Sequence, residues 1–484
     1  MFPNPQDALP LPARPNLEQY EKLAKSLLKA CKSQPTNPNA IDDWAERWVS
    51  RLVKASGVKF QHSMPVRVSH WVSGVAEFIE RHMIASTNAG GSAPAQTRVS
   101  NPARTAGKAK QPPRRACNLT AAKFVIARSH GFRSWTQFAH HIQPLARSGS
   151  HDRDFETAAE AIVTGDLATL KRLLRRNPEL VRARSAREHN ATLLHYVSAN
   201  GVEGYRQRSP KNAVAIARAL LEAGAEVDAE ADVYGGGATT LGLVATSVHP
   251  QKAGVQLELL DLLLRHGAAI EHPRAGGNSA VAVRACLDNG QPRAAEFLAD
   301  RGARLDLVAA AGVGSVEQMW KFFLPDGAPG PGVTKEQIEA AFRYACGYGR
   351  TEAVEFLLNK GIDLGAHSGD GQTALHYAAI FGKLDIIKLL LAHNAPLELK
   401  NRYGGTVLGQ TLWSAAHGGD PEIYAQIIET LIAAGAKVPE RHVPVNASTD
   451  ALLERYGSRP EPSWNWFGEE PRRQRRKRTH QLAD

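Results

Sequence analysis

Three absences in this sequence of 484 residues exclude whole classes of protein. The cysteines Cys31, Cys117, Cys286 and Cys346 form no CxxC pair, which argues against a zinc ribbon or a disulfide framework. The longest apolar run, 305–314, is much shorter than the roughly 20 residues that span a membrane. Residues 1–14 lack the basic start and apolar middle of a secretory signal. The sequence therefore predicts a cytoplasmic protein without a membrane anchor.

Motifs that carry chemistry are also missing. Three glycines at 235–237 suggest a phosphate loop, but no lysine follows at the spacing such a loop needs. His140 and His141 are adjacent, so on a helix they point in different directions and make a poor metal site. There is no serine elbow, zinc motif or pair of catalytic acids. We expect no catalytic residue, cofactor or metal, and hence no enzyme.

The net charge of +11 is concentrated in two segments. Residues 86–118 contain six cations and no acid, and residues 471–484 contain six cations and one acid, so the rest of the chain is formally neutral. Both segments are rich in residues typical of linkers and tails. Cationic tails bind polyanions non-specifically by counterion release. Association with a polyanion or nucleic acid is therefore the alternative function, against the simpler interpretation of solvated, solubilising segments.

One phrase recurs along the chain: an apolar helix, a glycine or asparagine, and an apolar–acidic pair. Its turn residues are separated by 43, 35, 59, 33 and 41 positions, and they are Gly224, Gly267, Gly302, Gly361, Asn394 and Gly435. A period near 33 is typical of one class of helical repeat. The longer spacings then indicate insertions, and the spacing of 59 indicates a full repeat plus a shortened one over 305–327.

The segment 370–400, DGQTALHYAAIFGKLDIIKLLLAHNAPLELK, shows how such a repeat is built. Gly371 suits a tight turn, Thr373 suits a helix N-cap, and Gly382 suits a left-handed helix end. This segment closely resembles the ankyrin consensus. The resemblance covers 155–440 and implies an all-α fold, an ankyrin-repeat α-solenoid. It also implies that His376 is structural and bonds the backbone between repeats.

The resemblance and the composition together divide the chain. We expect an N-terminal helical region (1–85), a flexible basic linker (86–118), a helical lead-in that caps the stack (119–150), the ankyrin-repeat domain (151–440), a C-terminal capping helix (441–457) and a disordered basic tail (458–484). The phrases LLHYVSANGVEGYRQ and YGGGATTLGLVATSVHP resemble a bacterial ankyrin subfamily with a helical N-terminal lead-in.

Two insertions, 201–212 and 249–255, separate the two helices of consecutive repeats. Parallel stacking predicts that the two loops lie side by side and touch. They form either a structural brace or a second binding patch. The patch would contain Tyr205, Arg206, Gln207, Arg208 and His249.

Solenoids bind partners along an extended surface, and in ankyrin proteins this surface comprises the hairpin tips and first helices. The resemblance therefore implies a non-enzymatic protein–protein interaction module or scaffold with one or more protein partners. On the best-preserved repeat and the next hairpin, the predicted partner-binding residues are Asp370, Gln372, Tyr377, Ile380, Phe381, Arg402 and Tyr403.

Overall fold

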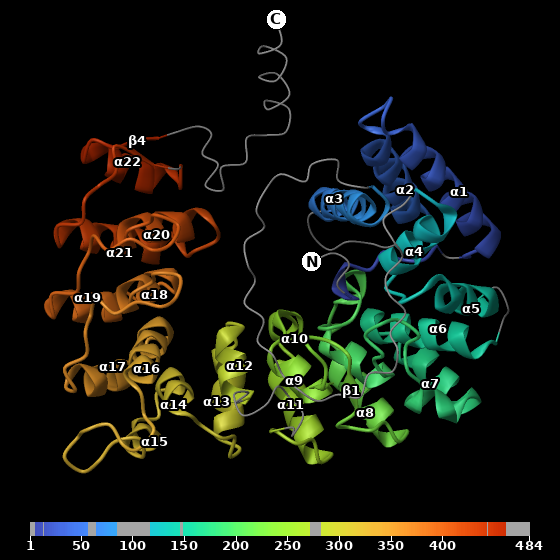
Figure 1. Cartoon of the computed structure of the whole chain (residues 1–484). Helices are drawn as coiled ribbons and strands as arrows, with labels where there is room; N and C mark the ends of the chain where they lie inside the picture. The colour runs from blue at the N-terminus through green and yellow to red at the C-terminus, as the bar shows by residue number, and fades with distance from the viewer. Residues whose placement is uncertain are drawn as a thin grey trace, which may run out of the picture. The chain divides into compact units, whose positions relative to one another are not determined.

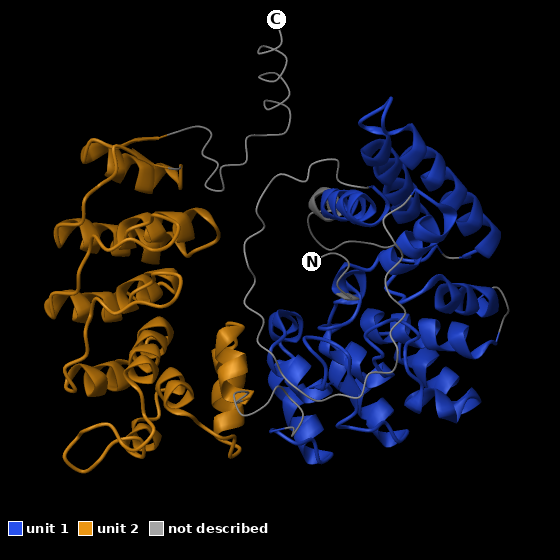
Figure 2. Ribbon diagram, viewed as in Figure 1, with its two compact units in different colours: residues 1–280 blue, residues 281–484 orange. Residues whose placement is uncertain are grey.

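A computed structural model describes residues 5–12, 14–56, 64–84, 117–145, 149–271, 282–442 and 444–460. The basic segments 86–116 and 461–484 lie outside these ranges, and so do the expectations of a flexible linker and a disordered tail there. In the described part, no helix is long and apolar enough to cross a membrane. The chain divides into two compact units, residues 1–280 and 281–484 (Figure 2).

Unit 1 begins with five helices that pack around a core rich in aromatic residues (Figure 1). Three of these helices lie in the predicted N-terminal helical region, where Trp44, Trp48 and Trp71 are buried. Gly131 follows the fourth helix in a left-handed conformation, and Ser134 caps the fifth. The elements are η1 (Pro5–Asp7), α1 (Leu17–Ser33), α2 (Ala40–Ser56), α3 (Met64–Met83), α4 (Leu119–Ser129) and α5 (Trp135–Leu145).

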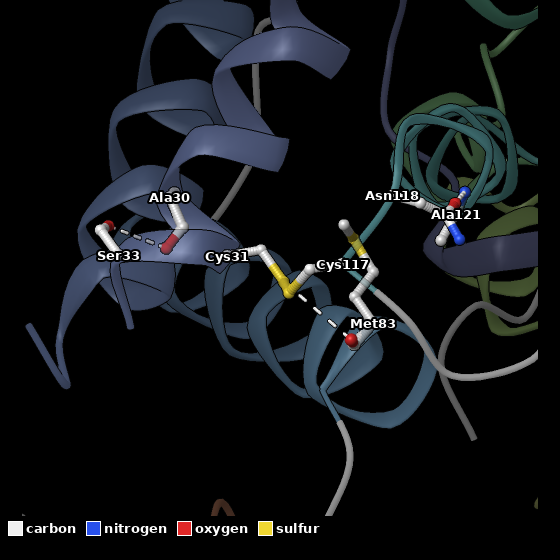
Figure 3. The surroundings of a disulfide bond; sticks show 7 residues. All are labelled: Ala30, Cys31, Ser33, Met83, Cys117, Asn118 and Ala121. Atoms are coloured by element: carbon white, nitrogen blue, oxygen red, sulfur yellow. Dashed lines mark hydrogen bonds between the residues drawn. A yellow bond between two sulfur atoms is a disulfide. The ribbon is translucent and has the colours of Figure 1, made fainter. Parts of the chain in front are cut away.

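The expectation that the cysteines form no disulfide is wrong. Cys31 of α1 and Cys117, two residues before α4, are joined by a disulfide, with their Cα atoms 5.9 Å apart (Figure 3). Helices α1 and α4 pack against each other, so folding brings together two cysteines that are 86 residues apart. Cys286 and Cys346 are free and buried. Cys117 and the N-cap residue Asn118 thus belong to the folded lead-in rather than to a linker.

The remainder of unit 1 forms repeats with irregular first helices. The first helix of the second repeat is a short 3-10 helix, η3, and part of the second insertion folds as a helix, α10, where we expected a loop. A turn that contains the three glycines at 235–237 connects β1 to its antiparallel partner β2. The elements are α6 (His151–Thr164), α7 (Leu167–Arg176), η2 (Pro178–Arg182), η3 (Leu193–Ser198), η4 (Gly204–Arg206), α8 (Ala213–Glu222), β1 (Glu230–Ala231), β2 (Ala238–Thr239), α9 (Thr240–Ala245), α10 (Val248–Ala253) and α11 (Gln256–Arg265).

Unit 2 is a stack of antiparallel helix pairs, ended by α22, whose Leu452 and Leu453 are buried in the common core. Within the described residues its only strands are a two-residue parallel pair, β3 and β4. The elements are α12 (Ala282–Asp288), α13 (Pro292–Ala299), α14 (Leu307–Val313), α15 (Val316–Trp320), α16 (Lys335–Tyr348), α17 (Thr351–Leu358), α18 (Ala374–Ile380), α19 (Leu384–Ala392), α20 (Val407–Ala416), α21 (Pro421–Ala433), β3 (Arg441–His442), α22 (Ala447–Arg455) and β4 (Arg459–Pro460).

The best-preserved repeat confirms the roles assigned to its residues. Thr373 caps α18 by accepting from the His376 amide, and Gly382 has a φ of +64° at the end of this first helix. The His376 ring lies between repeats: Nδ1 bonds with the Thr373 hydroxyl at 2.9 Å, and Nε2 with the Gly405 carbonyl at 3.3 Å. Burial lowers the pKa of His376, so the ring is neutral and structural.

Candidate partner-binding surface

The first helices of unit 2 carry aromatic side chains at equivalent positions. Tyr377 of α18 stacks on Tyr344 of α16, with ring centroids 6.5 Å apart, and Phe381 lies 5.4 Å from Tyr348 in the same way. Gly347 permits this close approach, since a β-carbon there would lie 3.2 Å from the Phe381 ring. The two helices therefore share a continuous row of half-exposed rings, with Phe381 the most open at 41% exposure.

The hairpin tips add polar groups beside this row. Asp370 accepts a hydrogen bond from Ser368, and the Asp370 carbonyl accepts from the Arg402 amide at 2.8 Å. The Arg402 guanidinium lies 5.2 Å from the Tyr403 ring centroid and donates to the Tyr403 hydroxyl. Tyr403 is 56% exposed. Consecutive tips are thus bonded to each other, while Tyr403 stays open to solvent.

A pocket of about 310 Å³ lies where a hairpin tip meets two first helices. Its size is at the lower end of the range for ligand pockets. Three of the predicted partner-binding residues line it, and they are Gln372, Ile380 and Tyr403. Asp370, Tyr377, Phe381 and Arg402 are not among the lining residues. Three of the seven predicted residues thus line this pocket, and the role of all seven in partner binding stays a prediction.

The remaining lining residues, which the sequence analysis missed, are Asn401, Gly405, Gln410 and Trp413. A signal for them was present. Gln410 and Trp413 follow Tyr377 and Ile380 by 33 positions, the length of one repeat, and so occupy the same faces of α20 and α18. Projecting the exposed positions of one repeat onto the next would have identified both.

The polar groups around this surface are held in defined positions but are incompletely bonded. Asn401 Oδ1 accepts from the amides of Tyr403 and Gly405, each at 3.0 Å, which fixes the hairpin. Gln372 Oε1 is buried and has no hydrogen-bond partner in the part of the chain that the structure describes. Burial and then the Asp370 carboxylate raise the pKa of Tyr377, so this hydroxyl is a neutral donor. The surface thus has fixed polar groups beside apolar walls, and the unbonded acceptor Gln372 Oε1 lies beneath it.

The second predicted patch lies in unit 1, and its two central residues are not at the surface. Tyr205 and Arg206 are buried, whereas Gln207, Arg208 and His249 are half-buried. Gln207 donates to the Val202 carbonyl at 2.9 Å, inside its own loop. Arg208 pairs with Glu160 of α6 at 2.9 Å. The first insertion is therefore fixed to the preceding repeat.

A buried network of charges explains this attachment. Arg206 contacts Glu156 at 2.8 Å and Glu203 at 3.3 Å, and Arg187 contacts the same two acids at 2.5 and 2.9 Å. Burial alone raises the pKa of Glu203, but the two guanidinium groups outweigh it and hold this pKa well below its usual range. His141 of α5 lies 3.3 Å from Glu156. The network thus connects three segments: the lead-in through His141, α6 through Glu156, and the insertion through Glu203 and Arg206.

Comparison with known proteins identifies the repeats. The family model for ankyrin repeats in three copies matches residues 307–402 and 342–441. The human Notch-regulated ankyrin repeat-containing protein is 33% identical over 100 residues, which cover 19% of this chain and 81% of that protein. An E3 ubiquitin-protein ligase, hecd-1 of Caenorhabditis elegans, is 40% identical over 65 residues, covering 13% of this chain.

A further relative is serine/threonine-protein kinase 12 of Arabidopsis thaliana, which is 29% identical over 127 residues, or 26% of this chain. The chain spans 2% of the length of the ligase and 26% of the kinase, so most of each enzyme has no counterpart in the match. The specific resemblance to a bacterial subfamily stays a prediction. The family model, the small human relative and the stacked helix pairs agree, and the chain belongs to the ankyrin-repeat proteins.

Proposed function

We propose that this chain is a non-enzymatic interaction module or scaffold, whose protein partner binds the pocket and the aromatic row of unit 2. The observation that carries the proposal is the pocket between Ile380, Tyr403 and Trp413, which joins the tip of one repeat to the first helices of two. Aromatic side chains that are partly exposed on a rigid scaffold are typical anchors of protein interfaces. Polar atoms without hydrogen-bond partners beside these aromatic side chains would fix the orientation of the bound partner.

The partner we propose presents an extended segment with one large apolar side chain, which enters the pocket between Ile380 and Trp413. If the Gln372 side chain turns toward the pocket on binding, its Oε1, now buried and without a partner in the described chain, would accept from an amide donor beside that side chain. Leaving a buried acceptor unsatisfied costs roughly 1–3 kcal/mol, so a donor at this place contributes both affinity and register.

Selection of displayed random peptides on the full chain tests this function. The selected peptides should share a large apolar residue and lose at least about tenfold in affinity, or 1.4 kcal/mol, for Trp413→Ala. Tyr456→Ala is the matched control, because Tyr456 is 56% exposed, like Tyr403, but lies beyond the pocket. Peptides that bind Trp413→Ala as well as the native chain would count against the proposal.

The shifted titratable groups that have structural partners support a non-enzymatic function. Burial lowers the pKa of His195 to about 4, and this ring bonds Thr192 and the Ala238 carbonyl between repeats. Glu156 and Glu203 are neutralised by arginines. Association of the basic segments 86–118 and 471–484 with polyanions stays a prediction.

A cytoplasmic location also stays a prediction, and the disulfide gives a reason to test it. Disulfides persist in oxidising compartments and are rare in the cytoplasm of mesophiles. Covalent trapping of free thiols in intact cells would show how many of the four cysteines are unpaired there. Modification of Cys286 and Cys346 alone, after denaturation, would show that Cys31 and Cys117 are paired in the native compartment.

A further inference from the structure

Lys360 places its ammonium group among three aromatic rings in unit 2. Nζ lies 4.7 Å from the ring centroid of Trp320, 5.2 Å from that of Phe356 and 5.3 Å from that of Phe323. Each distance is inside the range in which the quadrupole of a ring attracts a cation. A single ammonium that contacts three rings is held by an aromatic cage, which we define as Trp320, Phe323 and Phe356.

The fold builds this cage from the shortened repeat and its neighbour. Trp320 ends α15, Phe323 follows three residues later, and Phe356 lies on α17. The rings meet edge to face: Trp320 and Phe356 have centroids 4.9 Å apart at 74°, and Phe323 and Phe356 5.4 Å apart at 78°. These contacts fix the three faces relative to one another, so the cage is organised independently of Lys360.

A tight turn after Phe323 covers one side of the cage. The Leu324 amide donates to the Ala328 carbonyl at 2.8 Å, and Phe323 and Pro329 form an isolated bridge. Gly327 lies in this turn with a φ of +88°, and a β-carbon there would lie 2.6 Å from Lys360 Nζ. A side chain at position 327 would therefore strain the turn and push the end of the flexible Lys360 side chain away from it.

No carboxylate pairs with Lys360 among the described residues. A lysine ammonium is strongly hydrated, and burying it against rings alone removes part of its water without supplying a counter-charge. A quaternary ammonium is less hydrated and is the cation that aromatic cages bind best. Trp320 is 47% exposed, so solvent reaches this side of the cage. The ammonium group of Lys360 therefore binds the cage more weakly than a quaternary ammonium group would.

We propose that the cage of Trp320, Phe323 and Phe356 binds a quaternary ammonium group, and that Lys360 occupies it when no ligand is bound. The shared chemistry is a trimethylammonium cation, which a trimethylated lysine or a choline headgroup would supply. The ligand displaces Lys360, whose flexible stem lets its ammonium swing out to water. This site is separate from the pocket that contains Trp413, and neither proposal depends on the other.

Fluorescence anisotropy of the full chain with two labelled peptides tests the site. The peptides differ only in one lysine, which is trimethylated in the first and unmodified in the second. We expect the trimethylated peptide to bind at least about tenfold more tightly. Lys360→Ala should strengthen its binding by about tenfold, because the tethered competitor is removed. Unlabelled phosphocholine added to this complex distinguishes the sources: displacement as efficient as by the unlabelled peptide assigns a choline headgroup, and weaker displacement assigns a methylated lysine.

Trp320→Leu keeps apolar volume but removes the π face, and should weaken binding of the trimethylated peptide at least about tenfold. Tyr456→Leu is the matched control, because Tyr456 is 56% exposed and lies outside both the cage and the aromatic row. Unchanged melting temperatures show that both variants fold. Equal binding of the two peptides, full binding to Trp320→Leu, or no binding to Lys360→Ala at about 10 mM would each overturn the proposal.

Discussion

Ile380 and Trp413, which are 33 residues apart, occupy the same face of two successive first helices and line one pocket. Because the repeats stack, residues that are one repeat length apart in the sequence lie next to each other on the surface. The two side chains differ in size and shape and together set the form of the pocket. Under the proposed function, specific binding would depend on these two residues.

Breaking the buried charge network of unit 1 should be costly. Glu203→Gln leaves the guanidinium groups of Arg187 and Arg206 short of one counter-charge, so we expect a loss of about 3–5 kcal/mol in the free energy of unfolding. Arg208→Ala, which breaks an ion pair with the half-exposed Glu160, should cost less than about 1 kcal/mol. Denaturant titration of both variants measures the difference. Similar small losses would mean that the network contributes little.

The same network decides between the two interpretations of the first insertion. If the insertion is a brace, Arg206→Ala lowers the melting temperature and leaves the affinity of the unit 2 peptides unchanged. Binding to a partner through Arg206 would need a guanidinium that is already enclosed by Glu156 and Glu203. A variant that keeps its stability but loses a partner would contradict the brace.

Buried histidines should make stability fall in mild acid. The folded-state pKa of His195 is about 4, below its ordinary value of 6.5, so the unfolded chain takes up a proton first as the pH falls. The stability that the neutral ring contributes is therefore complete above pH 6.5 and is lost between pH 6.5 and 4, by at most about 3 kcal/mol. Urea titrations at several pH values should show this slope and a shallower one for His195→Gln. Identical slopes would exclude His195 as its source.

The disulfide should stabilise the lead-in. Cys31 and Cys117 close a loop of 86 residues, and loops of this length give a stabilisation of about 2–5 kcal/mol. Dithiothreitol should lower the melting temperature of the native chain. The double variant Cys31→Ser, Cys117→Ser should melt at the reduced temperature with or without the reagent. A native chain that is insensitive to reduction would show that the bond contributes nothing to stability.

Periodicity in the sequence predicted the helices and the caps, because these follow from local spacing, and the resemblance to ankyrin repeats implied the role of His376. The Cys31–Cys117 bond was missed because it depends on how α1 packs against α4, which spacing does not reveal. The placement of Arg206 was missed for a related reason. Its residue type suited a surface site, but its acidic partners Glu156 and Glu203 come from a helix and a loop that only the fold brings together. The pairing of Lys360 with Trp320 likewise appears only once the shortened repeat is folded.

Site-specific photo-crosslinking tests the central claim, that partners bind the pocket of unit 2. A photoreactive phenylalanine analogue would replace Tyr403 in one version of the full chain and Tyr456 in another, since these two tyrosines are equally exposed. The selected peptides should crosslink from position 403, through their large apolar residue, and not from position 456. Crosslinking from position 456, or from neither position while binding persists, would place the partner elsewhere and contradict the account.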